Sequence, residues 1–124
     1  MLSLESVVKV ADNSGIHTVK CLKFLDGFSN NKKGTLGNIA VVSLFHLRGY
    51  KKKSTRKVFL GIIVTLKIWF RRKTGVYIRS NQNRVVLLEN FEKLLGRVIK
   101  GPISIEVRKQ KKSLKILFLA KNIF

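Results

Sequence analysis

The side chains in this sequence with the clearest chemical potential are its lysines and arginines, which outnumber the acids 26 to 6 and give 124 residues a formal net charge of +20. They gather in four clusters: Lys32 and Lys33; Arg48, Lys51, Lys52, Lys53, Arg56 and Lys57; Arg71, Arg72 and Lys73; and Arg108, Lys109, Lys111 and Lys112. Ammonium and guanidinium groups at this density bind phosphate, and a polyanion relieves the self-repulsion of such a chain. The composition therefore predicts a nucleic-acid partner.

These clusters fall in predicted turns or at strand ends, where lysines are also tolerated simply because loops are solvated. Almost no acid lies among them, so we favour phosphate binding over that interpretation. A protein that places about eight cations on phosphates loses roughly 10³–10⁵-fold in affinity between low and moderate salt. We expect binding to structured RNA to show that loss.

The sequence offers little for catalysis or for metal binding. Its acids are scattered, and no glycine-rich phosphate loop is present. His17 and His46 are the only histidines, and with the single Cys21 they form no cluster at zinc-like spacing. We predict no catalytic residue, no metal, no cofactor and no enzymatic activity, and we expect Cys21 to be a small buried apolar residue.

No segment has the length or composition of a membrane span, because the longest apolar stretch, residues 58–66, is far below the roughly 20 residues required. Residues 1–5 do not resemble a targeting leader. We therefore expect no membrane partner. We also expect either synthesis in the compartment where the protein works or a leader that this sequence does not include. The abundance of Lys, Asn, Ile, Phe and Leu beside one proline suggests AT-rich coding, as in an organellar genome.

The segments that must carry the basic clusters are predicted to be β-strands. A hydrophobic content of 45% predicts a folded chain rather than a disordered basic tail. Strands are expected at residues 6–10, 17–25, 38–47, 57–67, 76–79 and 85–89, separated by clusters of Gly, Asn, Ser and Lys. Several of them are apolar on both faces, which favours a closed β-barrel.

The turns and the C-terminal segment have their own signals. Asp12 and Asn13, followed by Gly15, form a turn that favours positive φ at the glycine, and Gly101 with Pro102 ends an element. Propensity alone predicts a strand at residues 103–107. Residues 113–120 predict a short helix, with Leu114, Leu117 and Phe118 on one face. We expect one domain, with a barrel over residues 1–100 and an appendage over 101–124.

Residues 66–73 resemble part of a homeodomain recognition helix, but they lack the adenine-reading Asn and the preceding helices. Trp69 and Phe70 in this segment have three possible roles, which are stacking on a splayed base, capping the core and packing against a neighbouring protein. Packing on the core or on a protein is favoured.

An ordered series of short motifs identifies the family. Residues 10–15 read VADNSG, residues 34–39 read GTLGNI and residues 71–79 read RRKTGVYIR. Residues 21–27, 58–64, 83, 85–88, 96, 99, 101–102, 115–116 and 119–120 match in the same order. Nearly end to end, this set resembles the universal large-subunit ribosomal protein fourteen family.

The resemblance implies a five-stranded closed barrel, with a small C-terminal appendage that has a short helix at residues 103–109. It implies a structural role that binds large-subunit ribosomal RNA, contacts small-subunit RNA across the interface and packs against neighbouring ribosomal proteins. It places the loop 47–57 and the turn 67–73 against RNA. With the charge clusters, the expected RNA-binding residues are Lys32, Lys33, Arg48, Lys51, Lys52, Lys53, Arg56, Lys57, Lys67, Arg71, Arg72, Lys73, Arg79 and Arg108.

The resemblance also places Gly96, Arg97, Val98 and Ile99 on the intersubunit side, where a ribosome-silencing factor docks on the family surface. The family usually reads GTRIFGP there, whereas this chain reads GRVIKGP, with the arginine one place earlier. Such drift favours a mitochondrial ribosome, with the protein encoded in the organelle. A plastid or a bacterial cytoplasm is the alternative.

Two functions of other classes remain as alternatives. One is a free-standing RNA-binding or RNA-chaperone barrel that meets many RNAs transiently. The other is a basic membrane-surface module, which needs an amphipathic helix that only residues 113–124 approach.

Overall fold

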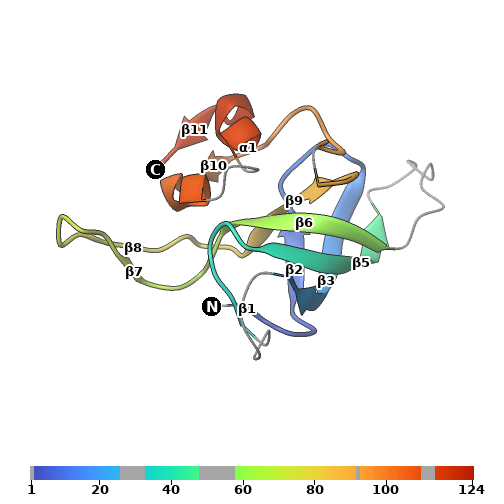
Figure 1. Cartoon of the computed structure of the whole chain (residues 1–124), viewed down its shortest axis with the longest axis horizontal. Coiled ribbons are helices and arrows are strands. Elements are labelled where there is room, and N and C mark those ends of the chain that lie inside the picture. The colour runs from blue at the N-terminus through green and yellow to red at the C-terminus, as the bar shows by residue number, and fades with distance from the viewer. Residues whose placement is uncertain (1, 26–32, 48–57, 92, 110–113) are drawn as a thin grey trace.

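A computed structural model describes residues 2–25, 33–47, 58–91, 93–109 and 114–124. Its centre is a closed barrel of five strands, β2 (Val7–Val10), β3 (Ile16–Phe24), β5 (Ile39–Leu47), β6 (Val58–Thr65) and β9 (Arg84–Leu88). Figure 1 shows a long hairpin that extends from this barrel and a small C-terminal appendage that packs beside it. The mainly β fold with a closed five-stranded barrel confirms the fold class predicted from the sequence.

The barrel closes through pairing between its first and last strands. Antiparallel ladders join β2 to β3, β3 to β5, β5 to β6 and β6 to β9. The remaining pair, β2 with β9, is parallel, and it aligns Lys9 with Arg84 and Val10 with Val85. This parallel seam removes both sheet edges, which would otherwise expose unpaired backbone groups.

The strands β6 and β9 are buried on both faces, because each strand contributes side chains to two separate apolar clusters. In β9, Val85 and Leu87 point into the barrel, whereas Val86 and Leu88 belong to a second cluster. That second cluster also includes Ile103 and other residues of the appendage. Both faces of these strands are therefore apolar for two reasons. The inner face fills the barrel, and the appendage covers the outer face.

The appendage is built from short elements, namely β10 (Pro102–Ile103), a 3-10 helix (Ile105–Lys109), α1 (Leu114–Leu119) and β11 (Asn122–Ile123). β10 and β11 pair in parallel. The family expectation of a helix at residues 103–109 is confirmed at Ile105–Lys109, and the strand expected from propensity ends at Ile103. Two-residue pairs also form between β1 (Leu2–Ser3) and β4 (Lys33–Gly34), and between β7 (Phe70–Arg71) and β8 (Tyr77–Ile78).

The predicted apolar face of α1 is wrong. Ile116 is the fully buried side chain of this helix, whereas Leu114 is exposed and Phe118 is 88% exposed. Of the predicted face only Leu117 is partly buried, and it packs with Ala120 against the apolar cluster that contains Ile116, so the buried face of the helix is centred on Ile116. The 3-10 helix supplies the partner surface through Val107.

Cys21 lies inside the barrel and is completely buried, as predicted. Burial raises the pKa of its thiol to about 11. The thiol is therefore protonated and shielded from solvent at neutral pH, which is unsuited to nucleophilic chemistry.

Gly15 occupies the turn between β2 and β3 with φ at +90°. Gly15→Ala should lower the free energy of unfolding by about 1–2 kcal/mol, because an L side chain is disfavoured in this backbone region. Gly61→Ala is the matched control, since a Cβ there would meet its neighbours at an ordinary 3.6–3.7 Å. Urea denaturation measures both variants, and equal stability of the two would contradict the prediction.

Candidate nucleic-acid interface

The hairpin formed by β7 and β8 carries three of the described basic residues that the sequence predicted, Arg71, Arg72 and Lys73. Arg71 pairs with Tyr77 and Phe70 with Ile78, and the backbone N–H of Arg72 donates to the Val76 carbonyl at 2.9 Å. Gly75 takes φ +87° in the turn. The hairpin that this short ladder closes extends away from the barrel (Figure 1).

Between the hairpin and the 3-10 helix lies a hollow of about 390 Å³, which we call the hairpin groove. It is lined by Phe70, Arg71, Arg72, Lys73, Thr74, Ile105, Glu106 and Arg108. The groove brings Arg108 from the appendage to the three cations of the hairpin, although these lie more than thirty residues earlier in the sequence. Arg108, the member of the fourth predicted cluster whose side chain is described, thus shares one surface with the third cluster.

Glu106 is the acid of this groove, and it is engaged by Arg72. The Arg72 Nε donates to Glu106 Oε1 at 2.7 Å, Nη2 donates to Oε2 at 3.4 Å, and the Ser104 hydroxyl also donates to Oε2. Burial raises the pKa of the Glu106 carboxyl, but the hydrogen bonds from Arg72 and Ser104 and the Arg72 charge bring its pKa below the ordinary value. The carboxylate is therefore ionised at neutral pH and binds the hairpin to the appendage.

This pairing divides the cations of the groove into two kinds. Arg72 is half-buried and its charge is matched by Glu106. Arg71, Lys73 and Arg108 are exposed, and none of them makes an ion pair with an acid in the described part of the chain. These three side chains are the ones free to meet phosphate.

Trp69 lies beside the hairpin and is 63% exposed, so it does not cap the core. The Arg79 guanidinium carbon is 5.0 Å from the Trp69 ring centroid, which is a cation–π arrangement. Lys67 is also exposed at the base of the hairpin. Phe70 differs, because it is half-buried and lines the hairpin groove.

The turn at residues 12–15 holds the segment that was predicted to face the other subunit. Asn13 Oδ1 accepts hydrogen bonds from the backbone N–H groups of Arg97 at 3.0 Å and Val98 at 3.3 Å, and Asn13 N donates to the Val98 carbonyl at 3.1 Å. Asp12 is fully buried and accepts from Ser14 N at 3.1 Å and from Leu87 N at 3.0 Å. The predicted turn residues and the predicted contact residues 96–99 are therefore joined by hydrogen bonds into one structural unit.

Within that unit, the four predicted contact residues differ in exposure. Arg97 and Val98 are exposed, whereas Ile99 is buried and Gly96 is enclosed. A Cβ on Gly96 would lie 2.8 Å from Asn13 Oδ1 and 2.9 Å from the Asp12 Cβ. Gly96 and Ile99 thus position the segment, and the side chains of Arg97 and Val98 are exposed to solvent.

Seven of the predicted RNA-binding residues lie outside the described residues, namely Lys32, Arg48, Lys51, Lys52, Lys53, Arg56 and Lys57. For Lys33 the structure describes the backbone, which belongs to β4. The interface described so far consists of Lys67, Arg71, Arg72, Lys73, Arg79 and Arg108.

Sequence reasoning missed Arg84, which fastens the appendage to the barrel. Its Nη1 donates to the Lys100 carbonyl at 2.9 Å, Nη2 donates to the Pro102 carbonyl, and Nε donates to Thr65 Oγ1 at 3.3 Å. Burial lowers the pKa of the guanidinium. Gly101, at φ +79°, has no room for a side chain because a Cβ would collide with Arg84. No local sequence pattern marks Arg84, because it is the first residue of β9 and its carbonyl partners come from another segment of the chain.

Within the described ranges, no three His, Cys, Asp or Glu side chains come together as a group that could hold a metal ion. None of the helices in the same ranges is long and apolar enough to cross a membrane.

The fold and the site define a class, which is a small, strongly basic β-barrel with a projecting cationic hairpin. The family model described as Ribosomal protein L14p/L23e matches residues 1–124. The chain is also 38% identical over 124 residues to the large ribosomal subunit protein uL14 of Petrotoga mobilis, with the whole of both chains covered. The chain belongs to the ribosomal protein L14p/L23e family, which confirms the resemblance drawn from the motifs.

Proposed function

We propose that this chain is a structural constituent of the large ribosomal subunit, folded as one domain, that binds large-subunit ribosomal RNA through its basic hairpin and loops. The observation that carries the proposal is the convergence of Arg71, Lys73 and Arg108 on the hairpin groove. Glu106 does not neutralise them, because Arg72 engages it. Family membership and the printed name of the Petrotoga mobilis protein support the ribosomal large subunit as the setting.

The proposed contact with small-subunit RNA lies on the segment at residues 96–99. Its support is the network in which Asn13 fixes the backbone of Arg97 and Val98 and leaves both side chains exposed. A cation beside an apolar residue suits contact with either RNA or protein. The same surface is the proposed docking site of a ribosome-silencing factor, and neighbouring large-subunit proteins are the other proposed partners.

The proposed compartment is the mitochondrial matrix, with a plastid or a bacterial cytoplasm as the alternative. Its support is compositional, since the chain is rich in Lys, Asn, Ile and Phe and has one proline. Fractionation of source cells with an antibody against the chain decides between these compartments.

Co-sedimentation tests the ribosomal assignment directly. Tagged protein from source cells should migrate with large subunits in a sucrose gradient after a high-salt wash and subunit separation at low magnesium. Protein found only in the free fractions would refute the assignment and would favour a transient RNA-binding or RNA-chaperone barrel.

A further inference from the structure

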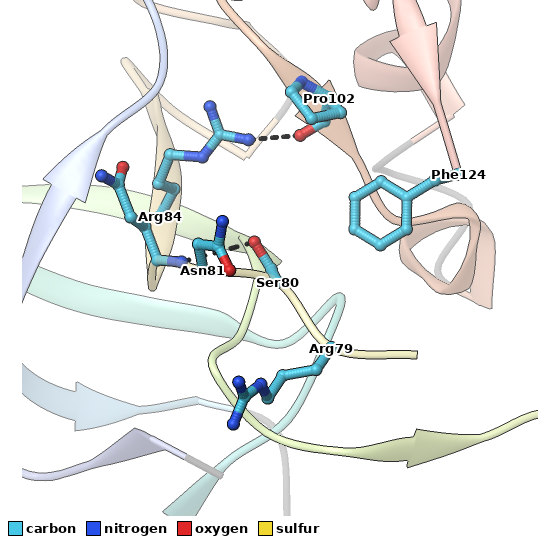
Figure 2. Close-up of a pocket in the computed structure, with 7 residues that line it drawn as sticks. Arg79, Ser80, Asn81, Arg84, Pro102 and Phe124 are labelled. Carbon is cyan, nitrogen blue, oxygen red and sulfur yellow. Dashed lines mark hydrogen bonds between the residues drawn. The ribbon is translucent and has the colours of Figure 1, made fainter. Parts of the chain in front are cut away.

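A second hollow, separate from the hairpin groove, lies where the chain enters β9. We call it the Phe124 pocket, and it encloses about 430 Å³. Its lining consists of Arg79, Ser80, Asn81, Gln82, Arg84, Pro102 and Phe124 (Figure 2). One wall is the segment at residues 79–82 and the other belongs to the appendage. The volume falls within the range of small-molecule sites in proteins.

Phe124 forms a fixed aromatic wall of this pocket. Its backbone N–H donates to the Ile103 carbonyl and its carbonyl accepts from the Ile105 N–H, both at 2.9 Å. On another side, Phe124 borders a gap of only about 10 Å³ that is also lined by Leu66 and Phe70. Figure 2 shows the ring facing the side of the pocket that carries Ser80 and Arg84. The backbone that carries the ring is therefore anchored, and the ring presents a flat apolar surface to the pocket.

The opposite wall carries hydrogen-bonding groups suited to the edge of a base. Asn81 and Gln82 are exposed, and each amide offers both donors and acceptors. The backbone beneath them is fixed, because Thr65 Oγ1 donates to the Gln82 carbonyl at 2.9 Å and Ser80 N donates to the Leu66 carbonyl at 3.2 Å. The backbone that carries the two amides is thereby anchored to the barrel.

Two arginines contribute positive charge to the pocket. Arg79 and Arg84 line it, and no Asp or Glu is among its seven lining residues. The Arg84 guanidinium is held by the Lys100 and Pro102 carbonyls, so it supplies a fixed positive potential. The Arg79 guanidinium lies over the Trp69 ring at the side of the pocket and is exposed to solvent. A phosphate beside the pocket would therefore meet a cation.

We infer that the Phe124 pocket binds one unpaired nucleotide of RNA, with its base against the Phe124 ring, its edge toward Asn81 and Gln82, and its phosphate near Arg79. This inference rests on the proposed RNA-binding function and names a second, base-contacting site for it. Unpaired bases are the part of an RNA that proteins stack on aromatic rings and read along their edges. The hairpin groove differs, because it offers charge for phosphate along paired RNA.

Two RNA stems test the inference with the full chain. One stem has a single bulged 2-aminopurine, and the other pairs the same base with uridine. Stacking of one base on an aromatic side chain corresponds to about 5- to 150-fold in affinity. We expect the bulged stem to bind tighter by a factor in this range, with quenching of the 2-aminopurine fluorescence on binding. Phe124→Leu should remove both effects but leave the affinity for the paired stem, and its salt dependence, unchanged.

Phe118→Leu is the matched control, because this ring is 88% exposed elsewhere on the appendage. If Phe124→Leu does not fold, Asn81→Ala combined with Gln82→Ala alters exposed side chains only and should reduce the preference for the bulged stem. Equal binding of both stems, or a preference that survives these changes in folded protein, would overturn the inference and leave the proposed function standing. Failure to bind either stem would overturn both.

Discussion

Simultaneous replacement of Arg71, Lys73 and Arg108 by glutamine should weaken RNA binding and flatten its dependence on salt. Each cation placed on a phosphate contributes about 0.9 to the slope of log K against log salt concentration, so we expect the slope to change by about 2–3. The parent protein, with about eight phosphate contacts, should lose roughly 10³–10⁵-fold in affinity between 50 and 200 mM salt. Anisotropy titrations of a large-subunit ribosomal RNA fragment at several salt concentrations measure both quantities.

The control for this experiment removes the same charge from the barrel surface, through Lys9→Gln, Lys20→Gln and Lys23→Gln on β2 and β3. Net charge is then equal in the two triple variants. If the control loses as much affinity and slope as the test variant, only overall charge matters and the hairpin groove has no special role.

Asp12→Ala should cause the largest loss of stability among single substitutions at the turn. The Asp12 carboxylate is completely buried, and its two oxygens accept from Ser14 N and Leu87 N. Removal leaves the buried N–H of Leu87 without its acceptor, and hydrogen bonds to charged groups contribute about 1.5–3 kcal/mol each. We expect the free energy of unfolding to fall by about 3 kcal/mol in urea titrations.

Asp12→Asn is the conservative counterpart, because it keeps the side-chain volume and one acceptor oxygen. It should lie between the parent and Asp12→Ala in stability. Hydrogen exchange at residues 96–99 should accelerate in Asp12→Ala, since this segment pairs with the turn through the bridge between Asp12 and Ile99. An Asp12→Ala protein with parental stability and exchange would contradict the role assigned to the turn.

The barrel strands were predictable because each combines a run of branched apolar residues with a clear turn signal. The expected strand at residues 17–25 is Ile16–Phe24, and that at 85–89 is Arg84–Leu88. Among the two-residue strands, β8 lies within the strand expected at residues 76–79. The pairs of Leu2 with Gly34 and of Pro102 with Asn122 were not predictable, because they form through tertiary contact rather than local propensity. The face of α1 was missed for the same reason, since only the packing surface selects Ile116 over Leu114.

For the candidate interface, the sequence located the basic residues but did not indicate which of them are paired with an acid in the folded chain. The family motif contained Arg71, Arg72 and Lys73, but nothing local distinguishes Arg72 from its neighbours. Its separate role follows from Glu106, which lies 34 residues away and meets it only in the folded chain. Arg84 is similar, because its partners are backbone carbonyls that no sequence pattern marks.

The parallel seam between β2 and β9 also sets the order of events during synthesis. β2 leaves the ribosome among the first elements, yet its closing partner follows some eighty residues later, and the Asp12–Leu87 hydrogen bond joins groups 75 residues apart. Until residue 88 has emerged, β2, β3, β5 and β6 can form at most an open sheet with an unpaired edge. Such non-local closure is slow and prone to aggregation. A nascent chain of this charge therefore benefits if RNA is already nearby when its last strand arrives.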